Sequence, residues 1–155
     1  MPERYEIQGE MFWVIDPELG IEHHERLGVC EKSDGHICYR KSKDLHGPSV
    51  FYGPRSEVLS LTWYVEGKKV GKVRRYYLNG QLYALERYVE GVCHGEQEYY
   101  YLNGTLKTKI PYNRGCLEGE VLLYWPSGKL KRRGLYSQGE KQEEVFFDEL
   151  QTTLS

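Results

Sequence analysis

The sequence lacks the short motifs that position catalytic groups in the commonest enzyme classes. It has no Gly-x-x-x-x-Gly-Lys-Ser/Thr phosphate-binding loop, no Gly-x-Ser-x-Gly nucleophile elbow and no His-Glu-x-x-His zinc-binding pair. These absences argue against the enzyme classes that depend on those motifs. We therefore predict a non-catalytic protein that uses no cofactor. An enzyme whose chemistry lies in a separate domain is the less favoured alternative.

Cysteines are few, and their spacing disfavours zinc and redox sites. The four are Cys30, Cys38, Cys93 and Cys116, and no two of them form a Cys-x-x-Cys pair. The even number leaves disulfides formally open, but no secretory signal accompanies them, so we expect reduced thiols. His23 and His24 lie between Glu22 and Glu25, which are residue types that bind metals. Because neighbouring side chains on a strand point to opposite faces, we predict no metal site there.

Long apolar runs are also missing from the sequence. No run approaches the roughly 18 to 20 residues that are needed to span a bilayer. The N-terminal segment Met1–Glu6 does not show the basic-then-apolar pattern of a secretory signal. We expect a soluble, cytoplasmic protein, and secretion that depends on another kind of signal remains an alternative.

The dominant feature of the sequence is a repeat. Four segments of 24 residues follow one another without a gap from Gly47 to Gln142. The opening glycine column contains Gly47, Gly71, Gly95 and Gly119, and the two tyrosine columns contain Tyr52, Tyr76, Tyr100 and Tyr124, then Tyr64, Tyr88, Tyr112 and Tyr136. Self-similarity at this period is typical of a stacked array, in which each unit packs only against its neighbours.

The pattern within a repeat predicts one β-hairpin. In the third repeat, two β-favouring runs flank Asn103-Gly104, and both of these residues tolerate the positive φ angles of tight turns. The first repeat has Pro54-Arg55-Ser56 instead, so we expect its loop to differ. Tyrosines at fixed places form a ladder of rings, each burying about 150 to 250 Å² if enclosed. We interpret them as structural residues rather than binding residues.

These residues resemble the MORN repeat, in particular its bacterial variant. The resemblance rests on Tyr88-Val-Glu-Gly91-Val-Cys-His-Gly95, followed by Tyr100-Tyr101 and Asn103-Gly104. It implies an all-β fold, in which stacked β-hairpin repeats form an elongated, twisted antiparallel sheet. It implies no chemistry, because such arrays serve as binding surfaces and spacers.

The segment before the repeats, residues 1–46, is predicted to be an N-terminal cap. Met11–Ile15 is expected to form a strand and Asp16–Gly20 a turn, which together start a hairpin. The stretch from Gly28 to His46 contains a weak echo of the repeat. We interpret it as a degenerate repeat that caps the first end of the sheet.

The segment after the repeats, residues 143–155, is predicted to be a C-terminal cap. Glu140–Leu154 fits an amphipathic helix, with Phe147, Leu150 and Leu154 on one stripe, but it also fits the first strand of a fifth repeat. The loss of the glycine and tyrosine at the repeat positions favours the helix. Such a helix would cover the sheet edge that the last hairpin leaves unpaired.

Charge is divided unevenly along the chain. Residues 47–142 carry 15 Lys and Arg against 9 Asp and Glu, whereas residues 1–46 carry 6 against 10 and residues 143–155 carry none against 4. A basic array with acidic ends suits an acidic partner, although solubility alone also explains it. The acidic ends and the sequence pI near 6.2 argue against nucleic-acid binding.

Nine candidate binding residues occupy equivalent or adjacent positions in the second half of each repeat. They are Leu59, Leu61, Tyr83, Leu85, Lys107, Lys109, Lys131, Arg132 and Arg133. Residues two apart on a strand share a face, which predicts one face that is apolar at one end and basic at the other. That surface suits an amphipathic partner. The alternative is that Leu59, Leu61 and Trp63 are covered by the N-terminal cap.

Two functional hypotheses follow, and neither fixes an oligomeric state. The first is a protein-interaction module with one specific partner, in the form of an antitoxin-like protein or of a scaffold or adaptor. The second is peripheral binding to anionic lipid through the basic face, where each basic residue near the surface contributes about 1 kcal/mol.

Overall fold

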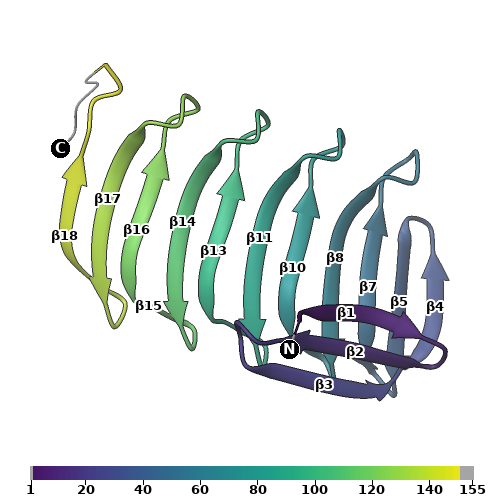
Figure 1. The fold of residues 1–155 in the computed structure, drawn as a ribbon. Helices are drawn as coiled ribbons and strands as arrows, with labels where there is room; N and C mark the ends of the chain where they lie inside the picture. The colour runs from purple at the N-terminus through teal and green to yellow at the C-terminus, as the bar shows by residue number, and fades with distance from the viewer. Residues whose placement is uncertain (1, 151–155) are drawn as a thin grey trace.

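Two antiparallel sheets make up the computed structural model, which describes residues 2–150 (Figure 1). The smaller N-terminal sheet has the order β1-β2-β3, formed by Arg4–Gln8, Met11–Asp16 and Ile21–Arg26. The main sheet has the path β18-β17-β16-β14-β13-β11-β10-β8-β7-β5-β4. Figure 1 shows it as an elongated array of successive hairpins. The predicted all-β repeat fold is confirmed.

The strands of the main sheet follow the repeat. They are β4 (Val29–Ser33), β5 (His36–Lys41), β6 (Asp44–Leu45), β7 (Gly47–Tyr52), β8 (Val58–Val65), β9 (Lys68–Lys69), β10 (Gly71–Tyr76), β11 (Leu82–Val89), β12 (Val92–Cys93), β13 (Gly95–Tyr100), β14 (Leu106–Asn113), β15 (Cys116–Leu117), β16 (Gly119–Tyr124), β17 (Leu130–Ser137) and β18 (Glu140–Phe146). Each of the first three repeats therefore consists of two long strands and one short bridging strand, whereas the fourth consists of β16 and β17 and leads into β18.

The loop inside each hairpin has the same backbone hydrogen bonds in all four repeats. In the second repeat the Tyr77 N–H donates to the Gln81 carbonyl and the Gly80 N–H to the Tyr77 carbonyl, with Gly80 at a φ of 89°. The first repeat makes the equivalent bonds, and Ser56 takes the left-handed position at a φ of 65°. The expectation of a different first loop was therefore wrong. Serine adopts this conformation at a cost in backbone energy that glycine does not pay.

A second turn connects each hairpin to the next. Glu66 and Gly67 both have positive φ, at 47° and 83°, as a type I′ turn requires. The Gly67 N–H donates to the Leu45 carbonyl of the preceding segment at 2.8 Å, and the Glu66 N–H donates to His46 Nδ1 at 3.0 Å. His94 accepts from the Arg114 N–H in the same way two repeats later. These two histidines are therefore turn caps.

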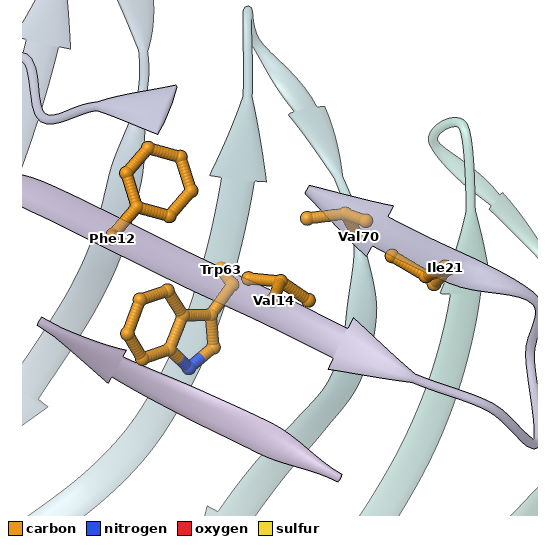
Figure 2. Packing of buried hydrophobic residues seen from close by; sticks show 5 residues of the cluster. All are labelled: Phe12, Val14, Ile21, Trp63 and Val70. Atoms are coloured by element: carbon orange, nitrogen blue, oxygen red, sulfur yellow. The ribbon is translucent and has the colours of Figure 1, made fainter. Parts of the chain in front are cut away.

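The N-terminal sheet lies across one face of the main sheet rather than at its end, with its strands crossing those beneath (Figure 1). The β2–β3 hairpin that the sequence predicts is present, with turn hydrogen bonds to the Asp16 and Pro17 carbonyls. Between the sheets lies an apolar cluster of Phe12, Val14, Ile21, Trp63 and Val70 (Figure 2). Alternation along β2 supplies Phe12 and Val14 to this cluster, and both are fully buried.

Polar contacts also hold the N-terminal sheet in place. The Tyr5 hydroxyl donates to Asp16 Oδ2 at 2.6 Å and accepts from the Lys72 N–H at 2.9 Å. Glu18 forms ion pairs with both Lys72, at 3.1 Å, and Arg87, at 3.0 Å. Burial raises the pKa of Tyr5 well above its usual value, and the hydrogen bond to Asp16 raises it further.

The C-terminal segment forms a strand, so the favoured prediction of a helix was wrong for the described residues. β18 pairs with β17 over six residue pairs, from Ser137 with Glu140 to Arg132 with Phe146. The type I′ turn at Gln138 and Gly139 sends the chain back along β17, and pairing satisfies backbone groups that a helix would have left unpaired. The remainder of the predicted helix, residues 151–154, lies outside the described residues.

We expect Gly71→Ala to destabilise the protein more than Gly80→Ala does. Both glycines have φ near 80° to 90°, at 79° and 89°, so both substitutions cost about 1 to 2 kcal/mol in backbone strain. A Cβ at Gly80 meets nothing within 4 Å, whereas one at Gly71 would lie 2.3 Å from the Tyr5 hydroxyl oxygen. Urea unfolding of the two variants measures the difference. Equal losses would show that Tyr5 is not seated against Gly71.

Candidate interaction surface

Strand register assigns the side chains of the main sheet to two faces, because directly opposite residues point the same way. One row across the sheet runs Leu61, Arg74, Leu85, Glu98, Lys109, Leu122, Arg133 and Val145. The neighbouring row runs Ser60, Arg75, Ala84, Tyr99, Thr108, Leu123, Arg132 and Phe146. We call the first row's side the docked face, since the N-terminal sheet packs there, and the other side the open face.

A β-bulge interrupts the alternation in every repeat. The register skips one residue of the second strand just after it begins, and the skipped residues are Leu59, Tyr83, Lys107 and Lys131. A bulge places an extra residue against one partner, so side chains two apart across it no longer share a face. All four skipped positions belong to the candidate set predicted from the sequence.

The prediction that Lys107, Lys109, Lys131 and Arg133 share one face was therefore wrong. Lys109 ion-pairs with Glu96 at 2.7 Å and Arg133 with Glu120 at 3.5 Å, and both pairs belong to the docked face. Lys107 and Lys131 instead line a hollow together with open-face residues such as Thr108 and Arg132. Strand alternation, on which the prediction depended, fails at the bulge.

The apolar candidates divide in the same way. Leu61 and Leu85 are on the docked face, and Leu61 packs against the cluster under the N-terminal sheet. Trp63 is 5% exposed in that cluster, which agrees with the alternative that the N-terminal segment covers this end. Tyr83, at a bulge, packs on Tyr77 with ring centroids 5.2 Å apart. Leu59 is half-buried.

The hollow on the open face lies over β14, β16 and β17 and has a volume of about 310 Å³. Its lining consists of Tyr101, Lys107, Thr108, Ile110, Val121, Leu123, Tyr124, Lys131 and Arg132. The aliphatic residues alternate along β14 and β16 and therefore share this side. The cations come from the bulges and from Arg132. An apolar floor with a basic rim is the result.

At the two bulges that contain a lysine, a neighbouring aromatic residue orients the lysine side chain. Lys107 Nζ lies 5.6 Å from the centre of the Tyr101 ring and Lys131 Nζ lies 4.4 Å from that of Trp125. The Tyr101 hydroxyl donates to the Tyr124 carbonyl of the next repeat at 2.7 Å. Sequence reasoning missed this column, although Tyr77, Tyr101 and Trp125 each follow a tyrosine of the first tyrosine column.

A polar cluster occupies the open face beside the hollow. Arg75 Nε donates to Glu86 Oε1 at 3.0 Å, and the Tyr99 hydroxyl donates to Glu86 Oε2 at 2.6 Å. Burial raises the pKa of Tyr99, and the hydrogen bond to Glu86 raises it further. Burial and then the Glu86 charge raise the pKa of Tyr88 as well. With its polar groups paired, this cluster is a structural feature rather than a catalytic centre.

Comparison with known families agrees with the repeat geometry. Three consecutive segments, residues 69–90, 94–114 and 117–138, match the MORN repeat variant. Residues 69–138 therefore contain three MORN repeats of this variant. The first repeat, from Gly47, precedes these segments and has Ser56 where the later MORN repeats have glycine in the loop. No curated protein matches the chain.

MORN repeats are non-enzymatic modules that generally mediate interactions with proteins or membranes. Within residues 2–150, the structure contains no helix that is long and apolar enough to cross a membrane. The open face of this MORN array is the surface that the N-terminal sheet leaves accessible, and the hollow is its apolar depression next to cations.

We expect the folded protein to lose stability above pH 10, in part through Tyr99. Its pKa is raised on folding, so the bound proton stabilises the fold below the unfolded pKa of about 10, and this stabilisation is lost as pH rises towards the folded pKa. Unfolding free energy, measured by urea denaturation from pH 8 to 11, should fall more steeply for the wild type than for Tyr99→Phe. Parallel profiles would contradict the hydrogen bond to Glu86 and the burial of Tyr99.

Proposed function

We propose that this protein is a non-catalytic interaction module whose open face binds one specific protein partner. The observation that carries the proposal is the pair of lysines, Lys107 and Lys131, beside an apolar hollow. No ion pair involves either lysine among residues 2–150. Buried apolar contacts supply affinity at protein interfaces, and surrounding charges set orientation.

The distribution of cations favours a protein partner over a lipid surface. Because of the bulges, Lys109 and Arg133 lie on the docked face, and Arg132 on the open face pairs with Glu144 at 3.3 Å. Within the described part of the chain, Lys107 and Lys131 remain beside the hollow without an ion-pair partner. At about 1 kcal/mol per basic residue, two contribute about 2 kcal/mol of attraction to anionic headgroups, which is marginal for stable membrane binding. An apolar hollow adds affinity mainly for a partner that inserts a side chain.

The proposed role has two concrete forms in a bacterial cytoplasm. One is antitoxin-like, in which the array covers a toxic partner and neutralises it. The other is a scaffold or adaptor that holds a partner within a larger assembly. Both use the same open face. Both are consistent with an array whose repeated residues have structural rather than catalytic roles.

We expect charge reversal on the open face to abolish partner binding, while the same change on the docked face does not. The test variant is Lys107→Glu with Lys131→Glu, and the matched control is Lys109→Glu with Arg133→Glu. Each tagged protein is used for affinity purification from cells of its source, with quantitative mass spectrometry of bound proteins. We expect the wild type to recover a single protein at a near one-to-one ratio. The recovered amount of this protein should fall at least about tenfold with the test variant.

Vesicles that contain one fifth phosphatidylserine test the competing hypothesis, which is peripheral binding to anionic lipid. Cosedimentation of the wild type with these vesicles, with no stoichiometric protein recovered, would replace the protein partner by a membrane. Thermal unfolding of both variants, followed by circular dichroism, verifies that they remain folded. Equal loss of the partner from both variants would refute the assignment to the open face.

A further inference from the structure

We propose that the hollow binds an acidic peptide segment, with one large apolar side chain on the hollow floor and a carboxylate on each side paired with Lys107 and Lys131. This inference rests on the proposed function, since it names the chemistry of the partner at the same surface. The ligand class is a peptide of a partner protein, and the following features of the hollow define it.

The floor of the hollow determines the central residue of the peptide. Ile110, Val121 and Leu123 supply aliphatic contact, and Val121 is only 7% exposed. A volume of about 310 Å³ lies at the lower end of the range for ligand sites, about 300 to 1,000 Å³. It suits one phenylalanine or leucine side chain rather than a cofactor. Burial of such a side chain is a common anchor of peptide binding.

The charges of the peptide follow from the pairing of nearby cations. Lys109 has Glu96, Arg133 has Glu120 and Arg132 has Glu144 as ion-pair partners. Lys107 and Lys131 instead lie over aromatic rings, which hold their ammonium groups beside the hollow. A carboxylate is the group that complements an ammonium without a counter-ion.

The spacing of the two carboxylates follows from the repeat. Lys107 is on β14 and Lys131 on β17, with β16 between them in the sheet (Figure 1). Two steps of about 4.8 Å separate their backbones by about 10 Å. An extended chain covers this distance in about three residues. Side chains at i and i+3 would point to opposite faces of an extended peptide, because only every second residue shares a face. Four residues span about 13 Å, which the flexible lysine side chains accommodate. The expected ligand therefore has acidic residues at positions i and i+4, with the apolar residue at i+2 on the same face.

The same sheet already binds an acidic, apolar segment on its docked face. There Glu18 pairs with Lys72 and Arg87, while Ile21, three residues further along the chain, enters the apolar cluster. The N-terminal sheet thus demonstrates that MORN strands of this chain combine carboxylate pairing with an apolar anchor. The hollow offers equivalent chemistry on the open face, where neither Lys107 nor Lys131 forms an ion pair with a residue of 2–150.

The test uses synthetic peptides and the full-length protein. The probe is an eight-residue peptide with Glu at i and i+4, Phe at i+2 and otherwise Ala and Ser; the controls replace Phe with Ala or both Glu with Gln. Affinity is measured by calorimetry. Binding should also change the fluorescence of Trp125, which lies under Lys131, and this change should be absent in Trp125→Phe.

We expect the probe to bind the wild type, and each control peptide to bind at least about tenfold more weakly. Lys107→Gln with Lys131→Gln should weaken the probe by a similar factor, whereas Lys109→Gln with Arg133→Gln should leave it within about twofold. Equal binding of the Gln peptide, equal loss in both protein variants or no binding at all would each overturn the inference.

Other occupants give distinct results. A concentration-dependent dimer in sedimentation velocity that Lys107→Gln with Lys131→Gln abolishes, without peptide binding, would assign the hollow to a second copy of the chain and overturn the inference. If the peptides fail but the cellular partner still depends on Lys107 and Lys131, this inference fails and the proposed function stands. If binding of the cellular partner is also unchanged by substitution of Lys107 and Lys131, the inference and the proposed function both fail.

Discussion

The positive-φ turn between hairpins is the constraint on which the array depends. In every repeat the N–H of the turn glycine donates to a carbonyl of the preceding segment, as Gly67 does to Leu45, and the Glu66 N–H before it donates to His46 Nδ1. The same arrangement recurs at Arg114 and Gly115, with His94 as the acceptor side chain. Because each connection must reach the backbone of its neighbour, it fixes how far apart successive hairpins lie. The regular sheet, its bulges and its two faces follow from that repetition.

The bulge decides which side chains the array presents. It occurs at the same place in each repeat, so one residue per repeat is shifted out of the alternating pattern. In the last two repeats that residue is a lysine, and the result is two cations beside an apolar hollow. In the second repeat it is Tyr83, which packs on Tyr77 instead. A change of residue type at one column thus changes the surface without changing the backbone.

Much of the fold was predictable because the same residue pattern occurs four times in the sequence. Columns of glycine and tyrosine, seen four times, identify hairpins and their period, and the MORN resemblance follows from the same columns. The candidate surface was less predictable. Lys107 and Lys131 were identified as candidates, but their separation from Lys109 and Arg133 depends on a backbone irregularity that side-chain alternation cannot reveal.

The two ends of the chain were the hardest parts to predict, since long-range contacts decide them. The helical spacing of Phe147 and Leu150 is real, yet β18 forms because the unpaired edge of β17 lies next to it. Glu18 and Asp16 have no local pattern that identifies their partners. Those partners, Lys72 and Arg87, are in the second repeat, so only the folded sheet brings the charges together.

The docking of the N-terminal sheet has a consequence for synthesis of the chain. Tyr5 and Lys72 are 67 residues apart, whereas contacts between hairpins span little more than one repeat. On the ribosome the strand Met11–Asp16 is made before the repeats, and its apolar side lacks its partners in the main sheet until Trp63 and Val70 have been made. At about 5 to 20 residues per second this interval lasts several seconds. During that time Phe12 and Val14 are exposed to chaperones and to other nascent chains.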